Sequence, residues 1–333
     1  MRLVPRLELN IVTGFLGSGK TTLLKRFLET SSPESTLVII NEYGRESIDD
    51  RLTLHLKSEI KTIADGCLCC TVLEHLRTTL LTILKRRAGG ELPHLQRIII
   101  ETSGLADPGP ILGTILSDEN LDEYIHVGPC ITTFDALEGT ESLKRFPEAA
   151  AQLAAADRVV LTKTDLVSDE AAQALLSVVR AVNPACTIMF SDVPEHAFAP
   201  TEMGVAVREL PPIQAISHAH TLSVQSFSAA LDVALDWATF SVWLTALLNR
   251  HGDRILRFKS VLSVRSSPGK LVVQGVRHRV YPPTHLPVQE AADDTSRLVF
   301  ITDGLTSERI LASLHQLVEH RLIDGRFAEM ALR

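Results

Sequence analysis

The stretch Gly14–Thr21, GFLGSGKT, fits the pattern G-x-x-x-x-G-K-[ST] of a phosphate-binding loop, or P-loop. It lies between an apolar run at residues 7–12 and a segment with helical spacing, as a loop that joins a strand to a helix must. Glycines let backbone N–H groups curl around phosphate oxygens, and the helix N-terminus adds a positive dipole. The pattern therefore predicts that the chain binds a nucleoside triphosphate with Mg²⁺.

Each residue type in this loop has an expected role. Lys20 should reach the β- and γ-phosphates, and the hydroxyl of Thr21 should bind Mg²⁺. An incidental glycine-rich turn would lack the strand and the helix that flank this one. The residues expected to cradle the phosphates are Gly14, Gly17, Ser18, Gly19, Lys20, Thr21 and Thr22.

Short apolar runs recur up to residue 190 and predict the strands of a mainly parallel sheet. They are poor in polar alternation and are separated by segments long enough for helices, which is typical of an α/β domain. A helix is clear at residues 170–183, where apolar residues fall at i, i+3, i+4 and i+7. The expected strands lie at residues 7–12, 36–40, 96–100, 128–134, 158–161 and 187–190.

The pattern changes after residue 190. Between Ser191 and Ala219 the periodicity fails and prolines accumulate, which indicates irregular chain. We therefore expect a P-loop domain over residues 1–212, a linker over 213–225 and a smaller α+β domain over 226–333. In that second domain the sequence predicts a helix around residues 240–248, strands at 254–264, 270–280 and 297–301, and a last helix at 307–320.

The composition excludes several classes of protein. The chain has 333 residues, of which 45% are hydrophobic and 22% charged, and no apolar run approaches the ~20 residues of a membrane-spanning helix. A formal net charge of -7 argues against broad contact with nucleic acid, which needs clustered Lys and Arg. Since the first residues lack an apolar signal segment, we expect a cytoplasmic protein with reduced thiols and with neither a membrane nor a nucleic-acid partner.

Residues 97–104, RIIIETSG, end a predicted strand with Glu101. P-loop proteins need a carboxylate at this place, close to Mg²⁺ or to the water that attacks the γ-phosphate. We therefore assign catalytic roles to Lys20 and Glu101. Thr21 and Glu101 are the expected residues of the magnesium site.

Residues 159–165, VVLTKTD, end another predicted strand with polar side chains. A carboxylate at Asp165 can accept hydrogen bonds from the ring N–H and the exocyclic amine of guanine. Adenine presents an acceptor at the ring position and would be repelled. We therefore expect Thr162, Lys163 and Asp165 to hold a guanine base, with Lys163 lying along the base and the P-loop.

The stretch Gly66–Cys70, GCLCC, holds three of the five cysteines of the chain. Three thiolates can hold Zn²⁺, Co²⁺ or Cu⁺, and the metal itself deprotonates them. Alternatively, Cys67 and Cys70 form a reversible disulfide, whereas the neighbours Cys69 and Cys70 would form a strained one. The spacing alone leaves both chemistries open.

Five motifs, in this order, give the chain a resemblance to the CobW family of P-loop GTPases, which includes metallochaperones. They are GFLGSGKTT, NEYG, GCLCC, ETSGLADP and LTKTD. In weaker form the resemblance extends over the second half of the chain. It implies a GTPase that binds a transition metal at Cys67, Cys69 and Cys70 and passes it to a client metalloprotein. The implied cofactors are GTP, Mg²⁺ and Zn²⁺, with Co²⁺ as the alternative to zinc, and a homodimer that forms with nucleotide is compatible with the resemblance.

By the same resemblance, Asn41 and Glu42 belong to the segment that responds to nucleotide. The family commonly has an acid directly after N-E-x-G, but Arg45 stands there. Many members also carry a long His-rich tract before the C-terminal domain, whereas this chain has only His218 and His220 in SHAH. These departures weaken the case for a carboxylate-assisted metal site and for a metal store in the linker. We expect the two histidines to be solvated residues of a loop that bind nothing, with a weak accessory metal site as the alternative.

Two other functions fit parts of the pattern. In a regulatory or redox-sensing module, GCLCC would form a reversible disulfide and bound GTP would report the state of the protein. A small-molecule kinase would use the same P-loop, but Asp165 favours guanine and so argues against ATP as the substrate.

Overall fold

The structure is a computed structural model. It describes residues 5–32, 34–40, 61–62, 69–199, 223–265, 267, 269–286 and 295–320. The chain divides into two compact units, one formed by Met1–Leu175 with Ile188–Thr201 and the other by Leu176–Thr187 with Glu202–Arg333. The predicted boundaries at residues 212 and 226 stay a prediction, since most of the expected linker lies outside the described residues.

In the described part of the chain, the larger sheet has seven strands in the order β3-β2-β4-β1-β5-β6-β7. The pairings of β1 with β4 and β5, of β2 with β3 and β4, and of β5 with β6 are parallel. The predicted α/β fold and all six predicted strands are confirmed. The strands are β1 (Leu7–Thr13), β2 (Thr36–Ile40), β3 (Lys61–Thr62), β4 (Arg97–Glu101), β5 (Ile125–Asp135), β6 (Arg158–Thr162) and β7 (Thr187–Phe190).

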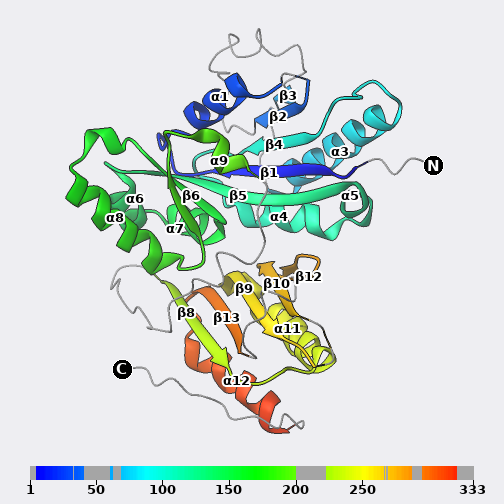
Figure 1. The fold of residues 1–333 in the computed structure, drawn as a ribbon, viewed down its shortest axis with the longest axis vertical. Coiled ribbons are helices and arrows are strands. Elements are labelled where there is room, and N and C mark those ends of the chain that lie inside the picture. The colour runs from blue at the N-terminus through cyan, green and yellow to red at the C-terminus, as the bar shows by residue number, and fades with distance from the viewer. Residues whose placement is uncertain are drawn as a thin grey trace. The chain divides into compact units, whose positions relative to one another are not determined.

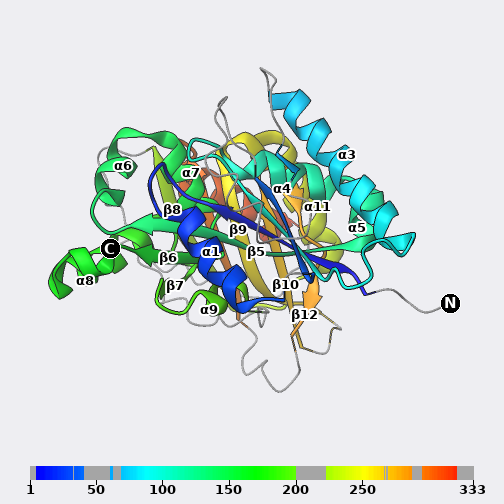
Figure 2. The ribbon, with the colours of Figure 1, turned by 90° about the horizontal axis from the view of Figure 1, so that it is seen from above.

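Helices cover both faces of this sheet (Figure 1). On one face α1 and α9 contact each other and pack on apolar residues of the central strands. On the other face α4 contacts α3, α5 and α7, and Figure 2 shows α3, α4 and α5 side by side. The helices are α1 (Lys20–Thr30), α3 (Cys69–Ala88), α4 (Pro108–Ser117), α5 (Glu119–Tyr124), α6 (Gly139–Arg145), α7 (Pro147–Ala155), α8 (Asp169–Val182) and α9 (Pro194–Phe198), with the short 3-10 helix η1 at Thr164–Leu166.

Helix α9 lies where the sequence predicts irregular chain. Pro194 occupies the first turn, a position that tolerates proline because its missing N–H has no partner within a helix anyway. Buried Arg158 of β6 donates from Nη1 to the carbonyl oxygens of His196 and Ala197, at 3.0 and 2.8 Å, and so satisfies groups at the other end of the helix. Neither the proline in the first turn nor the hydrogen bonds from Arg158 produce a periodic pattern in the sequence, so the helix was not predicted.

The second sheet is antiparallel and has the order β11-β10-β9-β13-β8, with β12 paired to β10. Its apolar core contains Phe258 and Phe300 of the sheet and Phe240 of α11. The run predicted as one strand at residues 270–280 is two strands, because the chain turns at Arg277, whose φ is 55°. The elements are β8 (Val224–Leu231), α11 (Trp237–His251), η2 (Gly252–Arg254), β9 (Ile255–Ser263), β10 (Lys270–Val276), β11 (Arg279–Val280), β12 (Thr284–His285), β13 (Ser296–Asp303) and α12 (Ser307–His320).

No helix within the described residues is both long enough and apolar enough to cross a membrane.

Candidate functional site

The P-loop joins β1 to α1 at the carboxyl edge of the larger sheet. Gly14, Gly17 and Gly19 have φ values of 139°, 72° and 91°, which side-chain-bearing residues rarely adopt. At Gly14 there is also no room for a side chain, since an added Cβ would lie 2.5 Å from the carbonyl oxygen of Thr133 on β5. The glycines of the motif therefore let the loop turn tightly and lie directly against β5.

Hydroxyl groups from neighbouring strands hold the loop from beneath. Ser18 Oγ lies 2.7 Å from Thr133 Oγ1, and the hydroxyl of Thr162 on β6 donates to the carbonyl oxygen of Ser18 at 2.8 Å. Ser18 and Thr162 are both buried. Two residues expected to contact nucleotide thus use their side chains to support the loop.

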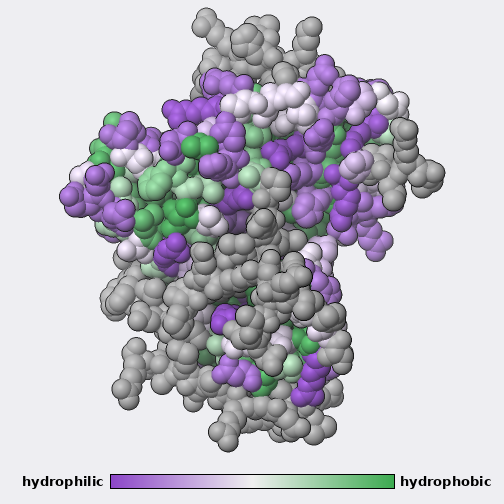
Figure 3. Space-filling model, viewed as in Figure 1, coloured by the Kyte–Doolittle hydropathy of each residue, from purple (hydrophilic) through white to green (hydrophobic). Residues whose placement is uncertain are grey.

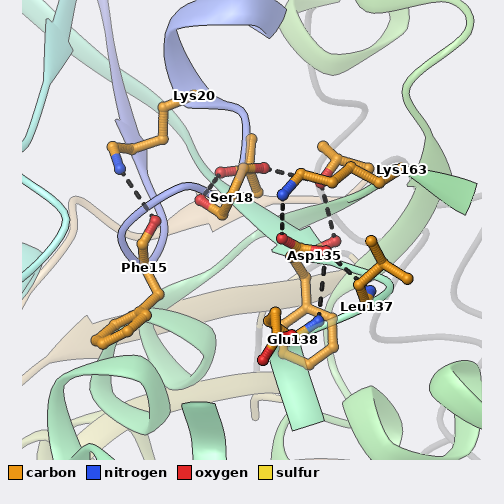
Figure 4. Close-up of polar contacts among 10 residues, drawn as sticks. Phe15, Ser18, Lys20, Asp135, Leu137, Glu138 and Lys163 are labelled. Atoms are coloured by element: carbon orange, nitrogen blue, oxygen red, sulfur yellow. Dashed lines mark hydrogen bonds and ion pairs between the residues drawn. The ribbon is translucent and has the colours of Figure 1, made fainter. Parts of the chain in front are cut away.

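Lys20 and Thr21 begin α1 and point to different partners. Lys20 Nζ donates to the carbonyl oxygens of Gly14 and Phe15, at 2.9 and 3.2 Å, so its ammonium lies over the loop (Figure 4). Thr21 Oγ1 donates to Oε1 of Glu101 at 2.7 Å, and the Glu101 side chain is buried at the end of β4. A hydroxyl and a carboxylate are hard oxygen ligands of the kind that Mg²⁺ prefers, so this pair fits a magnesium ion.

The loop after β4 involves two residues that the sequence analysis did not assign, Gly104 within the loop and Gln152, which supports it from α7. An added Cβ at Gly104 would lie 2.6 Å from Leu16 Cδ2 and 2.7 Å from Leu16 N, so this loop touches the P-loop. Gln152 of α7 is 1% exposed and donates from Nε2 to the carbonyl oxygens of Gly104 and Ala106, at 3.1 and 3.0 Å. The glycine of ETSG was a visible signal, whereas Gln152 comes from a distant helix and carries no local motif.

A cavity of about 570 Å³ lies beside the loop after β6. Of the residues expected to bind nucleotide, it brings together Gly19, Thr22, Thr162, Lys163 and Asp165. Its other lining residues are Leu23, Arg26, Thr164, Leu166, Phe190, Ser191 and Asp192. Figure 3 shows hydrophobic residues gathered around α9 and β6, and the exposed Phe190 contributes an apolar side chain to this cavity.

The Lys163 side chain lines this cavity together with Gly19 of the P-loop, and its ammonium has a partner on β5. Its Nζ lies 2.5 Å from Oδ2 of Asp135, the last residue of β5, whose side chain is 8% exposed (Figure 4). Oδ1 of Asp135 accepts from the backbone N–H of Leu137 at 2.8 Å. Asp135 was not singled out from the sequence, although an acid that ends a buried strand is the same signal that marked Glu101.

The cysteines fall at the limit of the described residues. Cys69 and Cys70 are the first residues of α3, and Cys67 lies outside the described part of the chain. Asn41, Glu42, Arg45, His218 and His220 lie outside it as well. Within the described residues there is no group of three His, Cys, Asp or Glu side chains that could hold a metal ion.

Two protein families match the chain. Residues 8–190 match the family described as "CobW/HypB/UreG, nucleotide-binding domain". Residues 224–318 match "Cobalamin synthesis protein cobW C-terminal domain". The first match contains the P-loop, GCLCC, Glu101, Asp135 and the loop after β6.

Several known proteins are similar over nearly the whole chain. The "Zinc chaperone YjiA" of Escherichia coli (strain K12) is 32% identical over 314 residues, which cover 92% of this chain and 97% of that protein. The "Zinc chaperone CobW" of Pseudomonas aeruginosa is 29% identical over 357 residues, with 94% and 92% covered. The crystal structure of the Zn(II)-bound YjiA GTPase from E. coli superposes with a TM-score of 0.69 at 27% identity, covering 95% of this chain and 99% of that one.

Proposed function

The chain belongs to the CobW family of P-loop GTPases, and we propose that it is a metallochaperone that binds Zn²⁺ at Cys67, Cys69 and Cys70. In this proposal GTP controls the transfer of zinc to a client metalloprotein. The observation that carries it is the similarity to a zinc chaperone over 97% of that relative's length. Three thiolates from one motif leave the zinc shell one ligand short of the four protein ligands of a structural site, which suits an ion that must be released.

The nucleotide would bind across the carboxyl edge of the larger sheet. We assign the phosphates to the P-loop, the guanine base to the cavity beside Asp165, and Mg²⁺ to Thr21 and Glu101. When bound, the ion neutralises charge on the β- and γ-phosphate oxygens. Lys20 would exchange its bonds to the loop carbonyls for bonds to phosphate, and Glu101 would hold Thr21 or orient the attacking water from its buried position.

Helix α3 offers a route from the cysteines to the phosphate side of the site. It begins at Cys69 and contacts α4, the helix that directly follows the loop of Gly104 and Ala106. Farther along, Arg77 of α3 forms an ion pair with Asp118, which caps α5 and whose side chain is 7% exposed. Burial alone would raise the pKa of Asp118, but Arg77 and two backbone N–H donors together hold that pKa below its ordinary value. A change in the loop at Gly104 would therefore reach the helix that starts at the metal motif.

Competitive zinc titration of the full-length protein tests this proposal. The titration would be made with GDP, with a non-hydrolysable GTP analogue in the presence of Mg²⁺, and without nucleotide. We expect Cys67→Ser and Cys69→Ser to weaken zinc binding by about tenfold or more, because even the loss of an outer-shell partner has that effect. Cys186→Ser is the matched control, since Cys186 is buried and lies in the second unit.

Each part of the proposal can fail separately. Unchanged zinc affinity in the two motif variants would place the metal elsewhere. Equal zinc affinity in all three nucleotide states would show that GTP does not control the metal. The mass of the protein isolated without reductant distinguishes the redox alternative, because a disulfide lowers the mass by two hydrogens and holds no zinc.

A further inference from the structure

We propose that Asp135 is a positioning residue for the guanine nucleotide and acts by fixing the side chain of Lys163 beside the base. The inference rests on the proposed placement of guanine next to Asp165. It adds a residue from β5, outside the loop motif, to the recognition of the base.

The carboxylate of Asp135 is held rigidly. It ends β5, its side chain is 8% exposed, and Oδ1 accepts from the N–H groups of Leu137 at 2.8 Å and Glu138 at 3.4 Å. Oδ2 remains directed at Lys163 Nζ, 2.5 Å away (Figure 4). A buried carboxylate fixed by backbone donors and turned toward one cation gives that cation a single preferred place.

The backbone of Lys163 is constrained to match. Its φ of 57° and ψ of 27° are left-handed, a conformation that residues with side chains adopt rarely and mostly where the surrounding structure requires it. Among the described residues other than glycine, only Arg277 shares a positive φ. Leu166 N donates to the Lys163 carbonyl oxygen at 3.1 Å, which ties the residue into η1.

The Lys163 side chain lines the base cavity, while its ammonium group contacts Asp135. Lys163 lines the cavity that also contains Asp165, whereas Asp135 is absent from the lining of that cavity. With its ammonium on Asp135, Lys163 offers the base its methylene groups rather than its charge. A long cationic side chain commonly covers an apolar surface in this way while its charged end lies elsewhere.

This arrangement makes a specific prediction about affinity. Without the charge of Asp135, the ammonium of Lys163 has no fixed partner on β5, and the side chain must be ordered each time the base binds. We expect the dissociation constant for GDP to rise by about tenfold, the lower end of what a lost charge-assisted hydrogen bond costs. Binding of inorganic triphosphate should not change, because it uses the P-loop and no base.

A double-mutant cycle on the full chain tests whether Asp135 acts through Lys163. Asp135→Asn keeps the Oδ1 acceptor for the backbone donors, so the turn after β5 retains its hydrogen bond. It removes the negative charge and replaces the Oδ2 acceptor of Lys163 by an amide donor. GDP and triphosphate affinities would be measured for wild type, Asp135→Asn, Lys163→Met and the double variant. We expect Asp135→Asn to weaken GDP binding in the wild-type background and to have no further effect next to Lys163→Met.

Three results would overturn the inference. They are unchanged GDP affinity in Asp135→Asn, the same loss in the Lys163→Met background, and an equal loss of triphosphate binding, which would indicate general damage to the P-loop. Failure of the proposed placement of guanine is distinguishable, because the wild-type protein and Asp165→Asn would then bind GDP equally well. If Asp165→Asn weakens GDP binding and Asp135→Asn does not, only the role of Asp135 is wrong.

Discussion

Replacing Gly14 by alanine tests whether the P-loop takes its shape from close contact with β5. An added Cβ would lie 2.5 Å from the carbonyl oxygen of Thr133 and 2.7 Å from Oγ of Ser18. The φ of 139° at Gly14 is also a conformation that alanine rarely adopts. Gly14→Ala therefore combines steric overlap with backbone strain.

Gly17→Ala is the matched control, because a Cβ at Gly17 would meet no atom within 4 Å and only the strain of a φ of 72° remains. That strain costs about 1–2 kcal/mol. At Gly14 a strain of about 1–3 kcal/mol adds to an overpacking cost of similar size, since the Thr133 carbonyl belongs to an interior strand and cannot easily move. We expect the free energy of unfolding to fall by about 2–6 kcal/mol in Gly14→Ala and by about 1–2 kcal/mol in Gly17→Ala.

Urea unfolding without nucleotide, followed by circular dichroism, measures both free energies. The absence of nucleotide matters because bound GDP would stabilise each variant by an amount that depends on its affinity. Equal destabilisation of the two variants would refute the reasoning, because contact with Thr133 would then add nothing to backbone strain. A Gly14→Ala protein as stable as wild type would refute it as well.

Three further predictions concern other parts of the molecule. Asp165→Asn replaces one acceptor oxygen by an amide donor, so GTP binding should weaken by about 1.5–3 kcal/mol. Xanthosine triphosphate has an acceptor where guanine has its exocyclic amine, so its affinity should rise relative to that of GTP. Competition between the two nucleotides measures this change in preference, and an unchanged preference for GTP would contradict the prediction. Gln152→Met should lower the free energy of unfolding by about 2–4 kcal/mol, because the carbonyl oxygens of Gly104 and Ala106 lose their buried donor. The variant should also hydrolyse GTP more slowly. Wild-type stability and a wild-type single-turnover rate would argue against a supporting role of Gln152 for this loop. Burial, followed by the charges of Arg250, Arg254 and Arg309, lowers the pKa of His251 below its ordinary 6.5. As the pH falls below about 6.5, the unfolded chain therefore binds a proton at His251 before the folded chain does, and the stability of the fold should decrease. His251→Gln should flatten that part of the pH profile measured by thermal unfolding.

The sequence predicted the strands well because parallel strands are buried on both faces. Continuous apolar runs such as residues 98–100 have no polar alternation, and these side chains have no exposed surface in the sheet. Helix α8 was predicted for the complementary reason, since its apolar side chains recur with helical spacing. β8, by contrast, mixes serine and alanine with few large apolar residues, and so gave no comparable signal.

The local motifs located the P-loop, Glu101 and Asp165, but they did not reveal the supports of the site. Asp135 reaches Lys163 only because β5 and β6 are neighbours in the sheet, and Gln152 reaches Gly104 only because α7 packs against β5 and α4. Such contacts depend on strand order and helix placement, which periodicity along the chain does not encode. The same limit explains why the motifs did not reveal that the side chains of Ser18 and Thr162 support the loop.

The hydroxyl contacts beneath the P-loop also have a consequence for the synthesis of the protein. The motif itself is complete once Thr21 has left the ribosome, but the partners of the Ser18 hydroxyl and carbonyl oxygen are Thr133 of β5 and Thr162 of β6. A nascent chain that has exposed only its first hundred residues or so would therefore display GFLGSGKT without the strands that shape it. We expect ribosome-bound chains to gain nucleotide affinity only after β6 has emerged and paired with β5, so that the first binding of GTP reports completion of this edge of the sheet.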